Sequence, residues 1–223
     1  MISFDRKSAH FRRHLNFFTK TIPSPSICEL YLMMEPKKRK VIIVGDSNVG
    51  KTSVMFTYVE GTFRQHFSTI GAGERTKVVD IGRGMKVNLD MWDTAGQERY
   101  KSQLRMYCTN SAVAVLMFDL TDKFTFESLD SWYTTVKDAV EPDTRYFIVG
   151  NKKDLEKTAG SFQREGDLYA AKIGAVGYFE TSAKTGSGIE ELFTTIAEEA
   201  IKVTRCGDQG VNLSGGGGGK GCC

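Results

Sequence analysis

The sequence lacks an apolar stretch long enough to cross a bilayer as a helix. Its longest uninterrupted hydrophobic run, residues 112–118, has the length of a strand, whereas a membrane-spanning helix needs about 18 to 20 apolar residues. We therefore expect a globular chain that reaches a membrane, if at all, through a lipid anchor.

Residues that could build a disulfide framework or a zinc site are also scarce. The five cysteines are Cys28, Cys108, Cys206, Cys222 and Cys223, and the three histidines are His10, His14 and His66. Neither set has the spacing of metal ligands, and the cysteine count is odd. No disulfide framework or zinc site is predicted, and a reducing, cytosolic setting fits.

Charge divides the chain. Residues 1–40 hold nine Lys or Arg and three Asp or Glu, a net charge of +6, whereas the remaining 21 basic and 24 acidic residues give −3. Because residues 1–36 show little periodicity, we expect a disordered basic extension there. Two alternatives stay open: an Arg-rich, acid-poor start is typical of a transit peptide, and Met33 or Met34 could be the natural first residue.

Strands and helices alternate after this extension. The pattern predicts strands at 40–46, 112–119, 145–152 and 177–180, a hairpin through 75–93, and helices at 52–60, 126–140, 164–173 and from 189 onward. The last helix keeps one apolar face through Ile189, Leu192, Phe193, Ile196, Ala197, Ala200 and Ile201. This alternation predicts an α/β fold whose six-stranded sheet is mostly parallel, has one antiparallel strand and carries helices on both faces.

A glycine-rich turn follows the first of these strands, in the sequence VIIVGDSNVGKT at residues 41–52. It matches every fixed position of the phosphate-binding pattern G-x-x-x-x-G-K-[ST]. Glycines let backbone N–H groups converge on an anion, Lys51 supplies a cation, and the Thr52 hydroxyl can ligate Mg²⁺. The stretch predicts a site for the phosphates of a nucleotide at the carboxyl edge of the sheet.

Three further polar clusters follow later strands: WDTAGQE at 92–98, NKKD at 151–154 and TSAK at 181–184. Together with the phosphate loop, and in this order, they resemble the motifs of Ras-superfamily small GTPases, and WDTAGQER is most similar to the Rab family. The resemblance covers about residues 40–205. It implies a GTPase G domain at 37–204, between the extension 1–36 and a flexible, Gly-rich tail at 205–223.

The resemblance also implies roles for individual residues. Gln97 is expected to orient the attacking water, and the Gly96 amide to meet the γ-phosphate, beside Lys51 and Thr69 as the other catalytic residues. Mg²⁺ is expected on Thr52, Thr69 and, through water, Asp93. The full set of implied nucleotide contacts is Asp46, Ser47, Asn48, Val49, Gly50, Lys51, Thr52, Ser53, Thr69, Asp93, Gly96, Asn151, Lys152, Asp154, Ser182, Ala183 and Lys184.

Selectivity for the base follows from the chemistry of one carboxylate. Asp154 can only accept hydrogen bonds when ionised, so it suits the N1–H and amino donors of guanine and opposes adenine. The resemblance adds the Asn151 side chain at the base edge, the stem of Lys152 on the ring and the Ala183 amide at O6. We therefore expect GTP and GDP, with Mg²⁺, to be the ligands.

The tail predicts a membrane anchor. Cys222 and Cys223 resemble the double geranylgeranylation site of Rab proteins, and two prenyl chains give the paired signal that stable anchoring needs. The resemblance implies the cytosol and the cytoplasmic face of intracellular membranes as locations, with TIGA, ERYxS and MY pointing weakly to the early-endosomal group. It implies an exchange factor, a GTPase-activating protein, effectors and escort or dissociation-inhibitor proteins as partners, and no nucleic acid.

Two departures from the family fall in the first switch. Rab proteins typically carry an aromatic where this chain has Glu74, and the interval from Phe63 to Thr69 is one residue shorter than usual. Phe63 is a candidate to stack on the nucleotide or to pack in the core. We expect a GTP-hydrolysing switch that recruits effectors in membrane traffic. A nucleotide-binding module without a hydrolytic cycle remains the alternative, and a small-molecule kinase would need an adenine pocket and a lid.

Overall fold

A six-stranded sheet organises the part of the chain that the computed structural model describes, residues 36–64, 72–94, 101–155 and 162–205. Its strands are β1 (Lys37–Val44), β2 (Ala72–Asp80), β3 (Lys86–Thr94), β4 (Val113–Asp119), β5 (Arg145–Asn151) and β6 (Tyr178–Glu180). They lie in the order β2-β3-β1-β4-β5-β6, and only the β2–β3 pair is antiparallel. The predicted fold class is confirmed.

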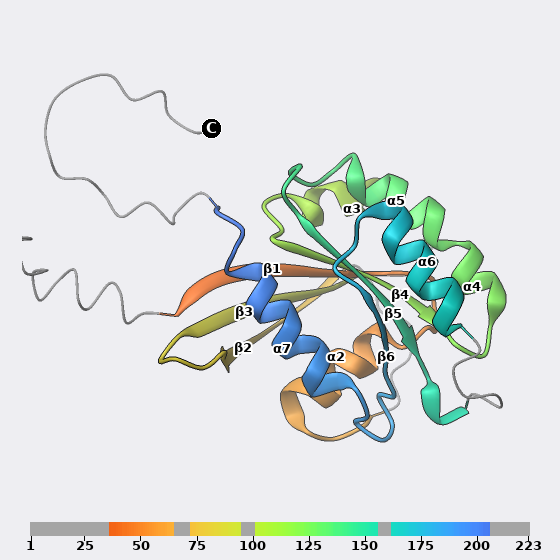
Figure 1. Cartoon of the computed structure of the whole chain (residues 1–223), viewed down its shortest axis with the longest axis horizontal. Coiled ribbons are helices and arrows are strands. Elements are labelled where there is room, and N and C mark those ends of the chain that lie inside the picture. The colour runs from red at the N-terminus through yellow and green to blue at the C-terminus, as the bar shows by residue number, and fades with distance from the viewer. Residues whose placement is uncertain (1–35, 65–71, 95–100, 156–161, 206–223) are drawn as a thin grey trace, which may run out of the picture. The chain divides into compact units, whose positions relative to one another are not determined.

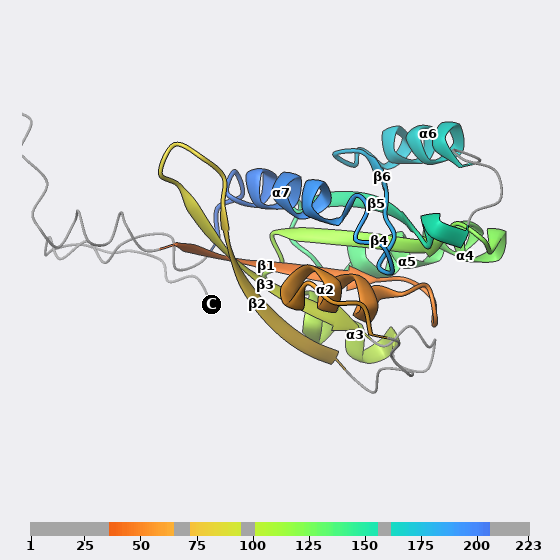
Figure 2. The same cartoon turned by 90° about the horizontal axis from the view of Figure 1, so that it is seen from below.

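Helices cover both faces of this sheet (Figures 1 and 2). They are α2 (Lys51–Glu60), α3 (Lys101–Cys108), α4 (Lys123–Glu127), α5 (Leu129–Lys137), α6 (Gln163–Ile173) and α7 (Ile189–Ala200), with a short 3₁₀ helix η2 (Lys153–Leu155). Apolar side chains of α2 and α7 form one core with Val41 and Ile43 of β1. Those of α3, α5 and α6 form a second core with Ile42 and Val44. Alternate residues of the central strand β1 thus pack into the cores on the two opposite faces of the sheet.

The parallel strands place the four sequence motifs at one edge. Because β1, β3, β4, β5 and β6 run in the same direction, the segments that follow them meet at their common carboxyl edge. All seven residues of β4 are buried, as expected for a strand covered on both faces. The site is therefore carried by the most deeply buried part of the sheet.

The predicted helix at 126–140 is wrong in its extent. The structure has two helices there, α4 and α5, which meet at Ser128. The Asp122 carboxylate caps α4 by accepting from the Phe124 amide at 3.0 Å, and the Ser128 hydroxyl donates to the Phe124 carbonyl at 2.9 Å. Such serine side chains compete with helical backbone bonds. Helix α3 also adds an element that the alternating pattern did not show.

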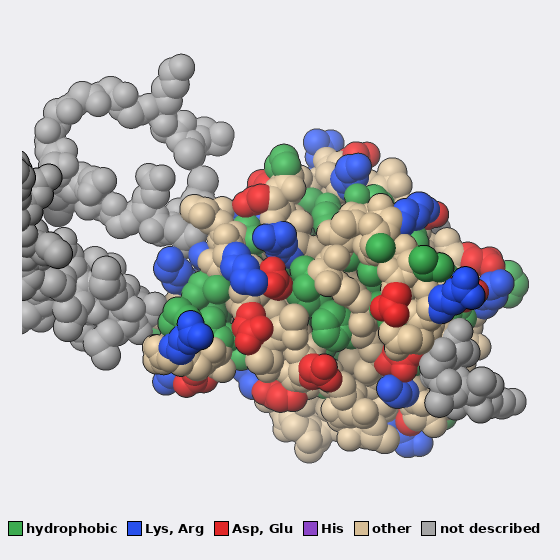
Figure 3. All heavy atoms as spheres, in the orientation of Figure 1, with side chains coloured by type: hydrophobic (Ala, Val, Ile, Leu, Met, Phe, Trp, Pro, Cys, Tyr) green, Lys and Arg blue, Asp and Glu red, His purple; other side chains and the backbone are tan. Residues whose placement is uncertain are grey.

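Charges of both signs are intermingled over the face that carries α6 and α7, with small apolar areas between them (Figure 3). Within the described residues, none of the helices has both the length and the apolar composition to traverse a bilayer. Phe63 is 44% exposed, so the core-packing reading of this residue is wrong.

Candidate nucleotide-binding site

The phosphate loop takes a conformation that only glycine allows at two positions. Gly45 has φ 146° and Gly50 has φ 96°, in the region that side chains disfavour. A β-carbon on Gly45 would lie 2.1 Å from the Met117 carbonyl oxygen, and one on Gly50 would lie 2.3 Å from Asn151 Nδ2. The backbone therefore approaches both β4 and the base-recognition motif closely, as a curled anion-binding loop requires.

Lys51 lies inside the curve of this loop. Its side chain is buried, and Nζ donates to the carbonyl oxygens of Gly45 at 2.9 Å and Asp46 at 2.8 Å. Burial lowers the pKa of Lys51 to about 8, an effect that the negative charges of Asp93 and Asp46 oppose. The ammonium group is thus held by neutral carbonyls at the place where the loop would surround an anion.

Oxygen ligands suited to Mg²⁺ lie beside the lysine. The Thr52 hydroxyl donates to Asp93 Oδ2 at 2.5 Å, and Asp93 is 1% exposed at the end of β3. Mg²⁺ typically takes one or two protein oxygens and completes its shell with phosphate oxygens and water. The described residues contain no group of three or more His, Cys, Asp or Glu side chains arranged for a metal. The two oxygen ligands of Thr52 and Asp93 suit a magnesium ion that takes its other ligands from a phosphate and water.

Asn151 connects the two halves of the site. Its Nδ2 donates to the Val49 carbonyl of the phosphate loop at 2.9 Å. Its Oδ1 accepts from the Thr181 hydroxyl and from the Ala183 amide, each at 3.2 Å. The side chain is 1% exposed, so all of these bonds are shielded from water. Asn151 fixes the phosphate loop against the TSAK segment.

The TSAK segment in turn orients the base-reading carboxylate. The Ser182 hydroxyl donates to Asp154 Oδ1 at 2.6 Å, and Lys184 Nζ lies 4.0 Å from Asp154 Oδ2. Ser182 is buried, whereas the Lys184 side chain is 64% exposed. One carboxylate oxygen of Asp154 thus accepts from serine, while the second faces the exposed Lys184 side chain.

The structure does not describe every predicted site residue. Thr69, Gly96 and Gln97 lie outside the described residues, as do Cys222 and Cys223. Within the phosphate loop, Asn48 takes a left-handed conformation with φ 65°, Val49 is fully buried, and Ser47 is exposed. Ser53 makes a long contact of 3.5 Å from its hydroxyl to the Arg64 carbonyl.

Two supporting residues were missed in the sequence. Asp119, at the end of β4, lies 2.7 Å from Lys152 Nζ, and its other oxygen accepts from the Thr121 amide and hydroxyl. Trp132 Nε1 donates to Asp46 Oδ1 at 2.8 Å. Asp119 was detectable in principle, because it is an acidic residue at the end of a predicted central strand. Trp132 stands mid-helix and gave no such signal.

The side chains around Trp92 form a separate surface, which we call the Trp92 surface: Lys40, Glu74, Trp92 and Tyr107. Glu74 is exposed and lies opposite Trp92 in the β2–β3 register. The Trp92 and Tyr107 rings are 5.9 Å apart, and Lys40 Nζ lies 4.7 Å from the Trp92 ring centre. Glu74 thus lies beside an aromatic pair that a lysine partly covers.

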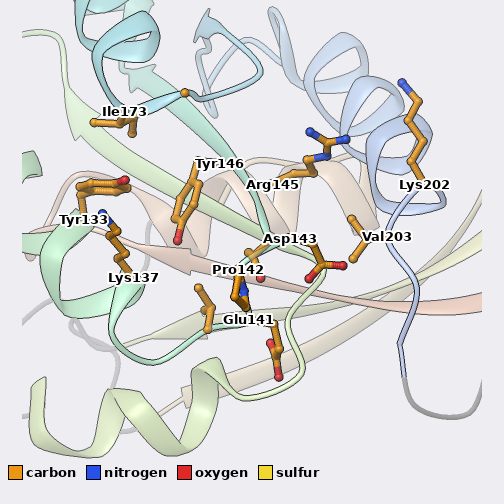
Figure 4. Close-up of a pocket in the computed structure, with 13 residues that line it drawn as sticks. Tyr133, Lys137, Glu141, Pro142, Asp143, Arg145, Tyr146, Ile173, Lys202 and Val203 are labelled. Carbon is orange, nitrogen blue, oxygen red and sulfur yellow. The ribbon is translucent and has the colours of Figure 1, made fainter.

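A cavity of about 540 Å³ lies away from these motifs (Figure 4). Tyr133 and Lys137 of α5, Arg145 and Tyr146 at the start of β5, and Lys202 after α7 are among its lining residues. Since β5 begins at this cavity and ends at Asn151 in the motif cluster, the cavity is at the opposite edge of the sheet. It contributes nothing to the nucleotide site.

The fold and the loop define a phosphate-loop nucleotide-binding domain, and comparison with known proteins specifies the family. A model of the Ras family matches residues 40–202. Ras-related protein Rab-26 from Bos taurus is 40% identical over 162 residues, which cover 72% of this chain and 62% of that protein. Ras-related protein Rab-21 is 38% identical over 167 residues in Bos taurus and in Homo sapiens, covering 74% of this chain and 74% and 73% of those proteins.

The chain therefore belongs to the Ras family and, within it, to the Rab small GTPases. Its aligned part spans less than two thirds of the length of Rab-26. Members of this family are GTP-binding, GTP-hydrolysing switches of membrane traffic that bind Mg²⁺, act with exchange factors, activating proteins and effectors, and associate with intracellular membranes.

Proposed function

We propose that this chain is a Mg²⁺-dependent GTPase that recruits effectors to an intracellular membrane in its GTP state. The observation that carries the proposal is the Asn151 network, which joins the phosphate loop to the TSAK segment through bonds of 2.9 and 3.2 Å. A phosphate loop alone serves many nucleotides. A phosphate loop tied to Asp154 and Ala183 holds phosphates and a guanine base at once.

Each group in the site has a definite task in this proposal. Lys51 neutralises the β- and γ-phosphates, and the loop amides from Asp46 to Ser53 cradle them. Thr52 and Asp93, with Thr69, hold Mg²⁺, which supplies charge neutralisation at the transferred phosphoryl group when bound. Asp154 accepts from guanine, Ala183 and Ser182 line its other edge, and the stems of Lys152 and Lys184 flank the ring.

Hydrolysis itself depends on positioning. Gln97 orients the water that attacks the γ-phosphorus, and the Gly96 amide meets a γ-phosphate oxygen. The sequence places no obvious arginine to neutralise charge in the transition state. Intrinsic turnover is therefore slow, and an activating protein completes the site.

Denaturing the purified protein and identifying the released nucleotide by chromatography tests the binding part of this proposal. Guanine nucleotide is the expected result, and adenine nucleotide would contradict it. A single-turnover assay with GTP, with a nonhydrolysable analogue as the control, tests hydrolysis. Tight GTP binding without phosphate release would favour a binding module that lacks a hydrolytic cycle.

Membrane attachment is a further part of the proposal. We place it at Cys222 and Cys223, prenylated by transferases that act with escort proteins, and a dissociation inhibitor would extract the prenylated form. Mass spectrometry of the protein purified from eukaryotic cells should show two prenyl additions, both lost in Cys222→Ser/Cys223→Ser. Imaging of the two forms would then identify the membrane, with early endosomes as the first candidate.

A further inference from the structure

One hydrogen bond joins the helix that follows the phosphate loop to the base-recognition segment. The Thr57 hydroxyl of α2 donates to the Ala183 carbonyl oxygen at 2.9 Å, across 126 positions of sequence. Thr57 is half-buried, and Ala183 is 4% exposed. No sequence motif includes Thr57.

The Thr57 hydroxyl, like that of Thr52 in the same helix, bonds outside its own helix. Thr134, Thr135 and Thr195 each donate to a carbonyl four residues earlier in their own helix, which is the common local bond for threonine. Thr57 has the same local option but donates to another segment. The Thr57 hydroxyl therefore makes a tertiary contact instead of a bond within its own helix.

The Thr57 bond closes a ring of contacts around the site. Ala183 is held at both polar backbone atoms, since its amide donates to Asn151 Oδ1 at 3.2 Å and its carbonyl accepts from Thr57. Asn151 returns to the phosphate loop through Val49, and α2 starts two residues after Val49 and continues to Thr57. Six helical residues beyond Lys51 extend about 9 Å. A rigid helix thus spans the distance from the phosphates to the base loop.

We propose that Thr57 is a positioning residue that fixes Ala183 for the guanine base and so slows nucleotide release. The inference rests on the proposed function, in which guanine O6 shares the Ala183 N–H that contacts Asn151 Oδ1 at 3.2 Å. Without the hydroxyl, Ala183 would lose one of the two hydrogen bonds that connect it to the phosphate half of the site. The rotation of the Ala183 peptide units would then be less restricted, and the bound base would be held less firmly.

The test measures release of tritiated GDP into excess unlabelled GTP. Thr57→Val keeps the branched shape and removes the hydroxyl, and release should accelerate about 5-fold, the typical effect of one net hydrogen bond. Thr57→Ser should release GDP at nearly the wild-type rate. Thr135→Val is the matched control, because the Thr135 hydroxyl bonds within its own exposed helix turn, and it should leave release unchanged.

A second ligand distinguishes positioning of the base loop from general loosening of the fold. In 6-thio-GDP the oxygen that Ala183 reads is replaced by a weak acceptor, so the effect of Thr57→Val should shrink toward 1-fold. An equal acceleration for GDP and 6-thio-GDP, or wild-type release of GDP, would overturn the inference. Thr57→Ala gives the same comparison if Thr57→Val does not fold. Failure of wild-type protein to retain GDP would instead refute the proposed function.

Discussion

The nucleotide edge of the sheet and the Trp92 surface are built on neighbouring strands, but by different means. At the edge, Lys51 and Asn151 are buried and donate to backbone carbonyls, and the buried Asp93 accepts from the Thr52 hydroxyl. On the Trp92 surface, Glu74 is exposed, and the aromatic rings are only partly covered. The groups proposed to bind nucleotide are thus fixed by internal bonds, whereas the side chains of the Trp92 surface are accessible to a partner.

The largest effect is expected at the nucleotide edge, where removal of the Lys51 cation should greatly lower the affinity for nucleotide. Lys51→Ala should weaken GDP and GTP binding by about 10²- to 10⁴-fold, because two charge-assisted contacts to phosphate are lost. Calorimetry of the nucleotide-free protein measures this. Lys172→Ala is the matched control, since Lys172 Nζ pairs with Asp130 at 3.0 Å on the exposed surface, outside the nucleotide motifs. Near wild-type affinity in Lys51→Ala would show that Lys51 does not bind the phosphates.

A second substitution at the same edge should slow hydrolysis without changing nucleotide affinity. Gln97→Leu should slow single-turnover hydrolysis by about 100-fold, the typical cost of misplacing a reacting group. Nucleotide affinity should stay within about 2-fold, because a water-orienting side chain contributes little to the bound ground state. Hydrolysis at the wild-type rate would show that another group orients the water.

A substitution on the Trp92 surface should change the affinity for effectors and leave nucleotide binding unchanged. Glu74→Phe, loaded with a nonhydrolysable GTP analogue, should bind Rab effectors about 10-fold more tightly, because burying an aromatic side chain contributes roughly 1.5 to 3 kcal/mol. A carboxylate buried there without a basic partner is unfavourable. Wild type should accordingly favour effectors that present Arg or Lys.

Glu74→Gln is the control for charge alone, because it keeps the shape and adds no aromatic ring. A panel of Rab effectors in pull-down assays measures all three proteins. If wild type and Glu74→Phe bind the panel equally, Glu74 does not determine which effectors bind. The nucleotide edge and the Trp92 surface would then differ only in how deeply their side chains are buried.

The smallest effect is expected outside both regions. Deleting residues 1–32 should leave the melting temperature and the nucleotide affinity unchanged, if this extension makes no contact with the GTPase domain. Scanning calorimetry and GDP release rates measure both quantities. A drop of several degrees would mean that the extension contributes to the packed domain.

The sequence predicted those parts of the site in which function requires particular residue types at a fixed spacing. The phosphate loop, NKKD and TSAK match motifs that follow successive strands, and a hairpin through 75–93 was predicted, whereas the register that sets Glu74 opposite Trp92 was learned from the structure. Contacts between distant residues without a motif were not predictable. Thr57 with Ala183 and Asp119 with Lys152 depend on the three-dimensional path of the chain.

The fully buried Cys108 gives this protein an internal chemical probe. It lies at the end of α3 in the second core, and burial raises the pKa of its thiol to about 12. Because thiol reagents attack the thiolate, labelling near neutral pH requires that this layer open first. Peptide-resolved labelling of Cys108 would therefore time the opening of the folded domain, and tightly bound GDP should slow it.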